Sequence, residues 1–216
     1  MDGLLLETER YVYLKTGLEA SKKAGFPVTK EFLTGIMGGG WSEYKGHFIE
    51  EYGEDYPFDE YWKYFWPEVE HLINDTAIPL RPGAKEILQY CKDNNIMTAV
   101  ATSSHLDVAR KCLKNSGIDD YFSFYMTGDM VEHSKPDPEI FLRTIEHFPV
   151  DKSEALVFED GHNGSQAAIR GGCRYVLVED IAFVSDEDRE KADLCTDTLL
   201  KAIDFIRKEN EGTSGI

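Results

Sequence analysis

The stretch Ala155-Leu156-Val157-Phe158-Glu159-Asp160-Gly161-His162-Asn163-Gly164 decides the fold of this chain. Four apolar residues lead into two adjacent carboxylates and a glycine, and Ser165-Gln166-Ala167-Ala168-Ile169 then predicts the start of a helix. A short apolar run bounded by turn residues indicates a strand that is buried on both faces. Glu159 and Asp160 would then lie at the carboxyl edge of a sheet, where open α/β sheets bind their ligands.

Two neighbouring carboxylates repel each other unless a proton or a cation lies between them. A hard cation that prefers oxygen ligands, such as Mg2+, would explain why Glu159 and Asp160 are adjacent. The alternative is that Asp160 or Asn163 only caps the following helix, which is a common role for these residue types. This stretch by itself leaves both interpretations open.

The composition limits the possible classes of function. The 216 residues suffice for one good-sized core, or for a core domain with a smaller insertion. The formal net charge of −17 argues against nucleic acid or an anionic membrane surface as the main partner. No apolar run is long enough to span a bilayer, and no amino-terminal signal peptide is visible. The scattered cysteines have neither zinc nor disulfide spacing, which favours the reduced thiols of a cytoplasmic protein: Cys91, Cys112, Cys173 and Cys195.

Helical patterns dominate the chain from about Glu9 to Asn74, where no strand is predicted. Gly38-Gly39-Gly40 interrupts them without the Gly-Lys-Ser/Thr of a phosphate loop, so we expect a flexible connection between helices. A dense aromatic patch predicts the core of a small helical bundle, or alternatively a surface that closes over a substrate. It comprises Tyr56, Phe58, Tyr61, Trp62, Tyr64, Phe65 and Trp66.

Predicted strands and helices alternate after Leu80-Arg81-Pro82-Gly83. Four strands are expected, at residues 96–101, 122–126, 155–158 and 174–178. This alternation indicates a parallel sheet with helices on both faces. Right-handed crossovers would place the ends of successive strands on one common edge.

Three polar loops therefore meet at one edge: Thr102-Ser103, Lys135 and Glu159-Asp160. Separately, Thr102 could simply end a strand and Lys135 could be a solvated lysine. Together the loops supply a hydroxyl donor, an ammonium and a carboxylate pair, which are the groups that hold a phosphoryl group and neutralise its charge during transfer. These loops contain no nucleophile.

These residues resemble the haloacid dehalogenase superfamily of aspartyl-phosphate phosphotransferases, in its β-phosphoglucomutase-like and pseudouridine-5′-phosphatase-like branch. The family's first motif is Asp-x-Asp-Gly, which Met1-Asp2-Gly3-Leu4-Leu5-Leu6-Glu7-Thr8-Glu9 matches from its x position onward. The second motif matches at Thr102, with Ser103 beside it, and the third at Lys135 in Ser-Lys-Pro-Asp-Pro-Glu-Ile-Phe. The fourth matches at Glu159-Asp160 in Phe-Glu-Asp-Gly-His-Asn-Gly, so the motifs occur in order over nearly the whole chain.

The resemblance implies an α/β fold with a Rossmann-like parallel sheet core and an inserted small α-helical cap domain. The core would comprise residues 1–8 and 77–216, and the cap residues 9–76. Asp2, Thr102 and Lys135 are the implied catalytic residues, and Thr102, Ser103 and Lys135 would bind the substrate. Asp160, Glu159 and Asp2 would bind Mg2+, with Asp2 contributing its backbone carbonyl and also acting as the general acid and base.

The implied activity is magnesium-dependent hydrolysis of a small phosphomonoester, either a sugar phosphate or a nucleotide-like ester, through an aspartyl-phosphate intermediate. The expected partner is a small phosphorylated metabolite, with no nucleic acid and no membrane, and the family implies a monomer. A response-regulator-like protein would fit the cap and the Lys135 motif poorly.

A phosphosugar mutase of the β-phosphoglucomutase type is one alternative function. Such an enzyme needs a basic cap residue soon after its Leu-x-Gly motif, because a second phosphate requires a cation in a buried site. Here Leu33-Thr34-Gly35 is followed by no arginine or lysine before Lys45, which favours a phosphatase, although Lys45 or Lys63 could reach inward.

The first motif departs from the family at the nucleophile, which would lie one position before Met1. It would belong to a first strand that is central in the family's sheet, and a core without that strand would lose more than the usual margin of stability. We therefore expect an upstream start that this sequence omits. The alternative is a catalytically dead binding protein that keeps the pocket without turnover.

Overall fold

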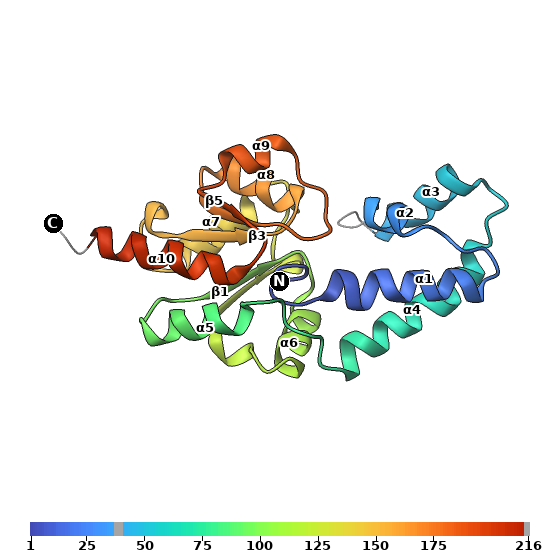
Figure 1. Ribbon diagram of the computed structural model, residues 1–216, viewed down its shortest axis with the longest axis horizontal. Coiled ribbons are helices and arrows are strands. Elements are labelled where there is room, and N and C mark those ends of the chain that lie inside the picture. The colour runs from blue at the N-terminus through green and yellow to red at the C-terminus, as the bar shows by residue number, and fades with distance from the viewer. Residues whose placement is uncertain (37–40, 214–216) are drawn as a thin grey trace.

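The computed structural model describes residues 1–36 and 41–213. Its first part is helical and forms a lobe to one side of the strands (Figure 1). The elements of this lobe are η1 (Thr8–Leu14), α1 (Lys15–Lys23), α2 (Lys30–Gly35), α3 (Trp41–Tyr52) and α4 (Phe58–Asp75). The helical prediction for this part of the chain is confirmed, whereas the domain limits of 9–76 and 77–216 stay predictions. The expected connection at Gly38-Gly39-Gly40 lies outside the described residues.

The second part of the chain alternates strands with helices, as predicted for an α/β core. Its strands are β1 (Ala99–Thr102), β2 (Phe124–Thr127), β3 (Leu156–Glu159), β4 (Arg174–Val178) and β5 (Leu194–Thr196). Its α-helices are α5 (Ala84–Asp93), α6 (Leu106–Asn115), α7 (Glu139–Glu146), α8 (His162–Gly171), α9 (Asp186–Lys191) and α10 (Leu199–Thr213). Short 3-10 turns lie between them at η2 (Asp119–Tyr121), η3 (Gly128–Met130) and η4 (Lys152–Glu154). None of the helices described is both long enough and apolar enough to cross a membrane.

The alternation of side chains along β4 explains how the core is layered. Tyr175 and Leu177 pack into one buried cluster with Ile140 and Phe141 of α7, whereas Val176 and Val178 belong to a second cluster. Successive side chains of a strand point to opposite faces, so a continuous apolar run requires cover on both sides. All four of these β4 residues are buried, which confirms the prediction of a parallel strand covered by helices.

The helical lobe has an aromatic core, as predicted. The rings of Phe48, Tyr61 and Phe65 are fully buried, and the centroids of Phe48 and Tyr61 are 4.7 Å apart. The hydroxyls of Tyr44 and Tyr61 lie 3.0 Å apart, so the polar end of the Tyr61 ring has a partner. Trp62 and Trp66 stack on each other at 5.3 Å and are only half-buried.

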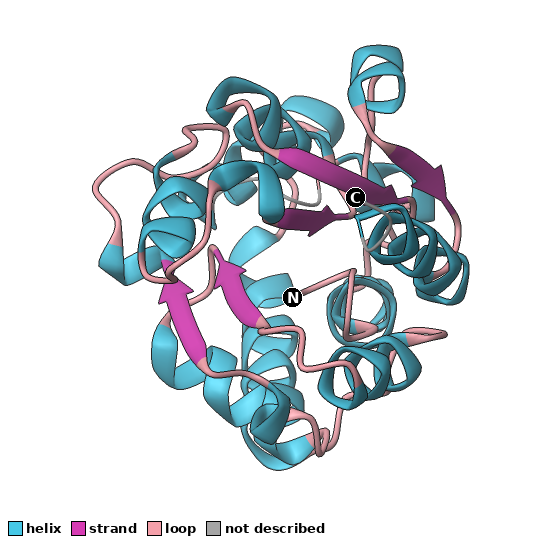
Figure 2. Ribbon diagram, turned by 90° about the vertical axis from the view of Figure 1, so that its left-hand side faces the viewer, coloured by secondary structure: helices cyan, strands magenta, loops and turns pink. Residues whose placement is uncertain are grey.

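The strands form two separate parallel sheets, β1–β2 and β3–β4–β5. Among the described residues, β1 and β3 therefore each pair with another strand on one side only. Figure 2 shows the two groups of strands with the amino terminus between them in that view. The resemblance to the dehalogenase family places a central first strand in a single sheet, and the observed sheet is interrupted between β1 and β3.

The first residues of the chain are packed into the core next to this interruption. Met1, Leu4, Leu5 and Leu6 are buried, and Leu6 is completely inaccessible. The backbone N–H of Glu7 donates to the carbonyl of Pro79 at 2.9 Å, and that of Arg81 donates to the carbonyl of Leu5 at 2.9 Å. The amino-terminal segment is thereby joined to the start of the second part of the chain.

A buried cluster of ion pairs stabilises the same junction. One guanidinium nitrogen of Arg81 lies 2.6 Å from Asp180 Oδ1 and 3.6 Å from Glu7 Oε1. Arg10, at the start of the helical lobe, reaches the same Asp180 oxygen at 2.6 Å. The side chains of Arg81 and Asp180 are only 9% and 1% exposed, so both charges are largely removed from water.

The structure also contains two elements that the sequence pattern did not predict, β5 and α9. α9 has the sequence Asp-Glu-Asp-Arg-Glu-Lys and lacks the apolar spacing on which helix prediction depends. Ser185 begins it by accepting a hydrogen bond from the N–H of Asp188, whose side chain bonds back to the N–H of Ser185. The strand expected at 96–101 is shorter and shifted, because β1 begins at Ala99.

Replacing Arg81 by alanine should lower the free energy of unfolding by about 3 kcal/mol, because the nearly inaccessible Asp180 would lose one of its two cationic partners. The control is Lys201→Ala, which removes an exposed pair with Asp197 and should leave the free energy of unfolding nearly unchanged. Urea denaturation of both variants measures the difference. Equal effects of the two substitutions would contradict a stabilising role for the Arg81 cluster.

Candidate active site

Glu159 is the last residue of β3 and Asp160 follows it, and both are buried, with exposed fractions of 8% and 9%. The other three residues of β3 are only partly buried, so the strand is less enclosed than its apolar sequence predicts. α8 begins two residues later, at His162. The Glu159 carboxylate lies against the first turn of this helix, where a Cβ on Gly164 would collide with it. Free backbone N–H groups at a helix amino terminus favour a nearby negative charge. The strand and the helix together therefore hold the two carboxylates at the edge of the sheet.

Lys135 connects the two sheets at this edge. Its ammonium forms an ion pair with Glu159 and also donates to the backbone carbonyl of Ala101 in β1 at 3.4 Å. The side chains of Lys135 and Glu159 are both 10% exposed. Removing one partner of such a pair leaves an uncompensated buried charge, which costs about 3–5 kcal/mol. The structure thus brings together the predicted residues Lys135 and Glu159.

The loop after β1 binds the side chain of Asp2 through a hydrogen bond. Thr102 is 3% exposed, and its hydroxyl oxygen accepts a hydrogen bond from the N–H of Ser104 at 3.2 Å. The Ser104 hydroxyl donates in turn to Asp2 Oδ2 at 2.9 Å. Ser103, which was predicted to bind substrate, has an exposed side chain. Ser104 was not predicted as a site residue, although it directly follows the predicted Thr102-Ser103 pair.

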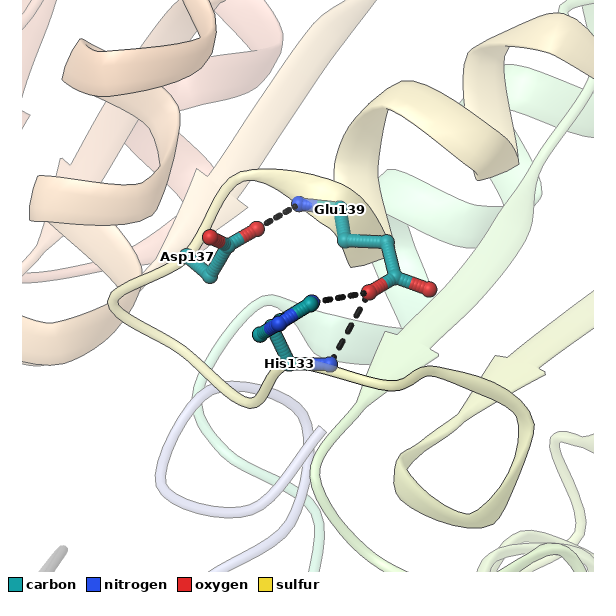
Figure 3. Close-up of side chains that lie close together, drawn as sticks. All are labelled: His133, Asp137 and Glu139. Carbon is teal, nitrogen blue, oxygen red and sulfur yellow. Dashed lines mark hydrogen bonds and ion pairs between the residues drawn. The ribbon is translucent and has the colours of Figure 1, made fainter.

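A carboxylate on α7 fixes the loop that carries Lys135. Glu139 accepts hydrogen bonds from the backbone N–H groups of Glu132 and His133 at 3.0 and 2.9 Å, and from Arg143 at 2.9 Å. These bonds, first the one from Glu132, lower the pKa of Glu139 to about 2. Figure 3 shows the Glu139 carboxylate bound to His133, and Asp137 Oδ1 bound to the N–H of Glu139.

His133, Asp137 and Glu139 also place three potential metal-ligating atoms within 4.8 Å of one another. Their hydrogen bonds to the protein account for the arrangement, which we interpret as support for the Lys135 loop (Figure 3). Asp2, Glu159 and Asp160 form no such compact group of side-chain atoms in the part of the chain described. The predicted contribution of Asp2 to metal binding is through its backbone carbonyl.

Glu9 is a further buried acid near Asp160 that none of the sequence motifs indicates as a site residue. It is 9% exposed, its Oε2 has no hydrogen-bond partner, and its Cγ lies 3.3 Å from the position of a Cβ on Gly3. A side chain on Gly3 would also collide with Asp160 Oδ2, and Gly3 has a φ of +65°. Glycine is therefore required at this position, both for its backbone conformation and for the close approach of Asp160.

Burial and mutual repulsion disfavour ionisation of these acids. Burial, followed by the charge of Glu159, raises the pKa of Asp160 well above its ordinary value, while the Met1 ammonium and Lys135 oppose this effect. Burial, followed by Asp2 and Asp180, raises the pKa of Glu9 to about 7. The site therefore holds more negative charge than its own cations offset, and a divalent cation with oxygen ligands would fit this donor set.

The basic residues considered for a mutase lie on the surface of the helical lobe. Lys45 pairs with Asp59 at 3.0 Å, and its side chain is 53% exposed. Lys63 pairs with Glu60 at 3.3 Å, and its side chain is 66% exposed. Neither ammonium approaches the carboxylates of the site through a contact in the structure.

Comparisons with known proteins agree with this architecture. Residues 1–178 match the family model described as haloacid dehalogenase-like hydrolase. A Thermotoga maritima protein named phosphorylated carbohydrates phosphatase is 30% identical over 172 residues, which cover 80% of this chain and 79% of that protein. A Drosophila melanogaster protein named probable pseudouridine-5′-phosphatase is 30% identical over 211 residues, which cover 95% of this chain and 88% of that protein.

A solved structure extends the comparison to the fold. The β-phosphoglucomutase of Clostridium difficile aligns with a TM-score of 0.70 and 23% identity, covering 99% of this chain and 96% of that one. A likeness at this identity shows that the two proteins share a fold. It agrees with the α/β core and the helical lobe found here.

The raised pKa of Glu9 predicts that stability falls as the pH rises from about 5 to 7. In this range the unfolded chain has lost the Glu9 proton, while the folded chain still holds it up to a pKa of about 7. The shift from 4.5 corresponds to about 3 kcal/mol. Urea denaturation in EDTA at several pH values measures this loss.

Glu9→Gln provides the matched comparison for this pH dependence. The variant cannot titrate at residue 9, so its free energy of unfolding should change less between pH 5 and 7 than that of the native chain. Identical pH profiles for the two proteins would show that Glu9 titrates at its ordinary pKa in the folded state.

Proposed function

The chain belongs to the haloacid dehalogenase-like hydrolases, and we propose that it is a magnesium-dependent phosphatase that hydrolyses a small phosphomonoester. The observation that carries this proposal is the buried Lys135–Glu159 pair, which joins the ends of β1 and β3 beside Asp160. Phosphoryl transfer requires fixed positive charge next to an anionic group. The relatives named as phosphatases support the same reaction class.

Thr102 and Lys135 are the residues that we propose bind the phosphoryl group. The Thr102 oxygen already accepts a hydrogen bond from the N–H of Ser104, so its O–H remains available to donate to a phosphate oxygen. Lys135 would contribute its ammonium to the charge that develops on the equatorial oxygens. The exposed Ser103 would contact the outer part of the substrate.

Asp2 is the proposed general acid and base. Its Oδ2 accepts a hydrogen bond from Ser104, which fixes the carboxyl group and leaves Oδ1 to exchange a proton with the leaving alcohol and then with water. Asp160, Glu159 and the backbone carbonyl of Asp2 are the proposed ligands of Mg2+. When bound, the cation would neutralise the phosphate charge and the excess negative charge of this edge.

The nucleophile is proposed to be an aspartate on a strand that pairs with the open edges of β1 and β3. Both edges belong to parallel strands that end at the site, so a parallel strand between them would deliver its last residue to the same place. In the family's Asp-x-Asp-Gly motif, Met1 takes the x position and Asp2-Gly3 the last two positions. The proposed aspartate would therefore lie one position before Met1. Attack on phosphorus would form an aspartyl-phosphate, which water then hydrolyses.

The remaining parts of the proposal concern the cap and the partners. Residues 9–76 would form a cap that closes over the site and excludes water, while residues 1–8 and 77–216 form the core. The substrate would be a small phosphorylated metabolite, either a sugar phosphate or a nucleotide-like ester. The protein would act as a cytoplasmic monomer that binds neither nucleic acid nor membrane, in keeping with its formal charge of −17.

A phosphosugar mutase is the less favoured function. It would need a cation from the helical lobe for a second phosphate, whereas Lys45 and Lys63 each pair with a surface carboxylate. An assay that follows both free phosphate and positional isomers of a hexose phosphate distinguishes the two activities. Release of phosphate without isomerisation is the expected result.

The central test compares this chain with one that is extended upstream through the proposed strand. With magnesium and a panel of phosphomonoesters, we expect turnover only in the extended chain, because the proposed nucleophile would lie on the added strand. Changing its restored aspartate to asparagine should abolish turnover. If both chains fold and neither hydrolyses any ester, the protein is a binding protein and the proposed activity is wrong.

In the active form, Asp2→Asn should lower kcat about 100-fold to 10,000-fold, which is the usual contribution of a general acid and base. Asn retains the hydrogen bond from Ser104 but cannot exchange a proton at neutral pH. Asp204→Asn, which changes an exposed carboxylate on α10, is the control and should leave kcat unchanged. A loss confined to KM would assign Asp2 to substrate binding instead.

A further inference from the structure

Glu9 lies in the first turn of η1, where the chain leaves the core and enters the helical lobe. Its side chain is nine-tenths buried, and Oε2 has neither solvent contact nor a hydrogen-bond partner. A buried acceptor without a donor costs free energy, so the position of this oxygen needs a physical reason. A donor that belongs to a bound ligand would supply that reason.

Glu9 lies close to Asp160. Glu9 Cγ lies 3.3 Å from the position that a Cβ on Gly3 would take, and Asp160 Oδ2 lies closer still, so the two side chains pack against the same residue. After burial, the charges of Asp2 and Asp180 contribute most to the raised pKa of Glu9. Glu9 therefore belongs to the group of acids at the amino-terminal segment, with its Cγ packed against Gly3 near Asp160 and its Oε2 buried without a partner.

The basic side chains in this part of the molecule already have other partners. Arg10 and Arg81 both bind Asp180, and Lys135 binds Glu159. A magnesium ion held by Asp160 would keep several of its water molecules, and these are strong hydrogen-bond donors. A carboxylate oxygen that lacks a protein donor is suited to accept from one of them.

We infer that Glu9 is an outer carboxylate of the cation site, whose Oε2 accepts a hydrogen bond from a water molecule bound to the cation at Asp160. This inference rests on the proposed magnesium-dependent function. It assigns to residue 9 a positioning role that acts through the cation and its water, without direct contact to the substrate. It also connects the first turn of η1, and with it the helical lobe, to occupation of the cation site.

The test is a comparison of metal affinity in the 216-residue chain and its Glu9→Gln variant. Calorimetric titration with MgCl2, and electron paramagnetic resonance with Mn2+ as a probe, report binding without any assay of activity. Loss of an outer partner of a metal site usually weakens affinity 10-fold to 100-fold, and we expect a change in this range. Glu19→Gln, which removes an equal charge from an exposed position on α1, should bind both metals like the native chain.

Thermal unfolding with and without magnesium separates this role from a structural one. Without metal, Glu9→Gln should melt at the native temperature or above it, because it removes an unpartnered buried carboxylate. With magnesium, its melting temperature should rise less than that of the native chain. Equal lowering of both melting temperatures, with native metal affinity, would overturn the inference and leave Glu9 a packing residue.

Asp160→Asn distinguishes failure of the inference from failure of the proposed function. If Asp160→Asn abolishes metal binding and Glu9→Gln binds like the native chain, the cation site stands and the role of Glu9 is wrong. If the native chain binds neither Mg2+ nor Mn2+, the proposed cation and the role of Glu9 are both wrong.

Discussion

One lysine ammonium offsets a group of buried carboxylates at the edge where the two sheets meet. In a region of low dielectric constant, charges a few ångströms apart interact far more strongly than in water. Lys135 pairs with Glu159 and also favours ionisation of Asp160. Because the whole chain carries a formal charge of −17, neutralisation at this edge depends on the few cations placed there. The Glu139 hydrogen bonds fix the Lys135 loop, and they therefore help to hold the ammonium that neutralises charge at this edge.

The fold and the site are assembled from the same contacts. β1 ends at Thr102 and is followed by the loop with Ser104, and β3 ends at Glu159 and is followed by Asp160. The amino-terminal segment brings Asp2 to Ser104. Lys135 bonds to both strand ends, so the spacing of the sheets determines whether its ammonium can reach Glu159. A change in the distance between the sheets would consequently alter the charge balance at this edge.

Periodicity and turn residues predicted the parts of the fold whose packing is visible in local sequence. Residues 174–178 form β4 as expected, because a strand buried on both faces needs a continuous apolar run. The polar helix α9 and the three-residue strand β5 escaped prediction, since their stability comes from a cap and from pairing with β4. The motifs located the loops that carry Thr102, Lys135 and Asp160, although the roles of these residues stay predictions. Ser104 and Glu9 were missed because their importance depends on contacts with residues far away in the sequence.

The unpaired edges of β1 and β3, two of the four outer edges of the described sheets, have a consequence for the behaviour of the chain in concentrated solution. An edge strand presents unpaired N–H and C=O groups in a row, which can template pairing with any extended polypeptide. Here β1 and β3 each present such a row, and each strand is only four residues long, which limits the strength of any accidental pairing. The interruption in the sheet therefore bears on self-association during synthesis and storage as well as on catalysis.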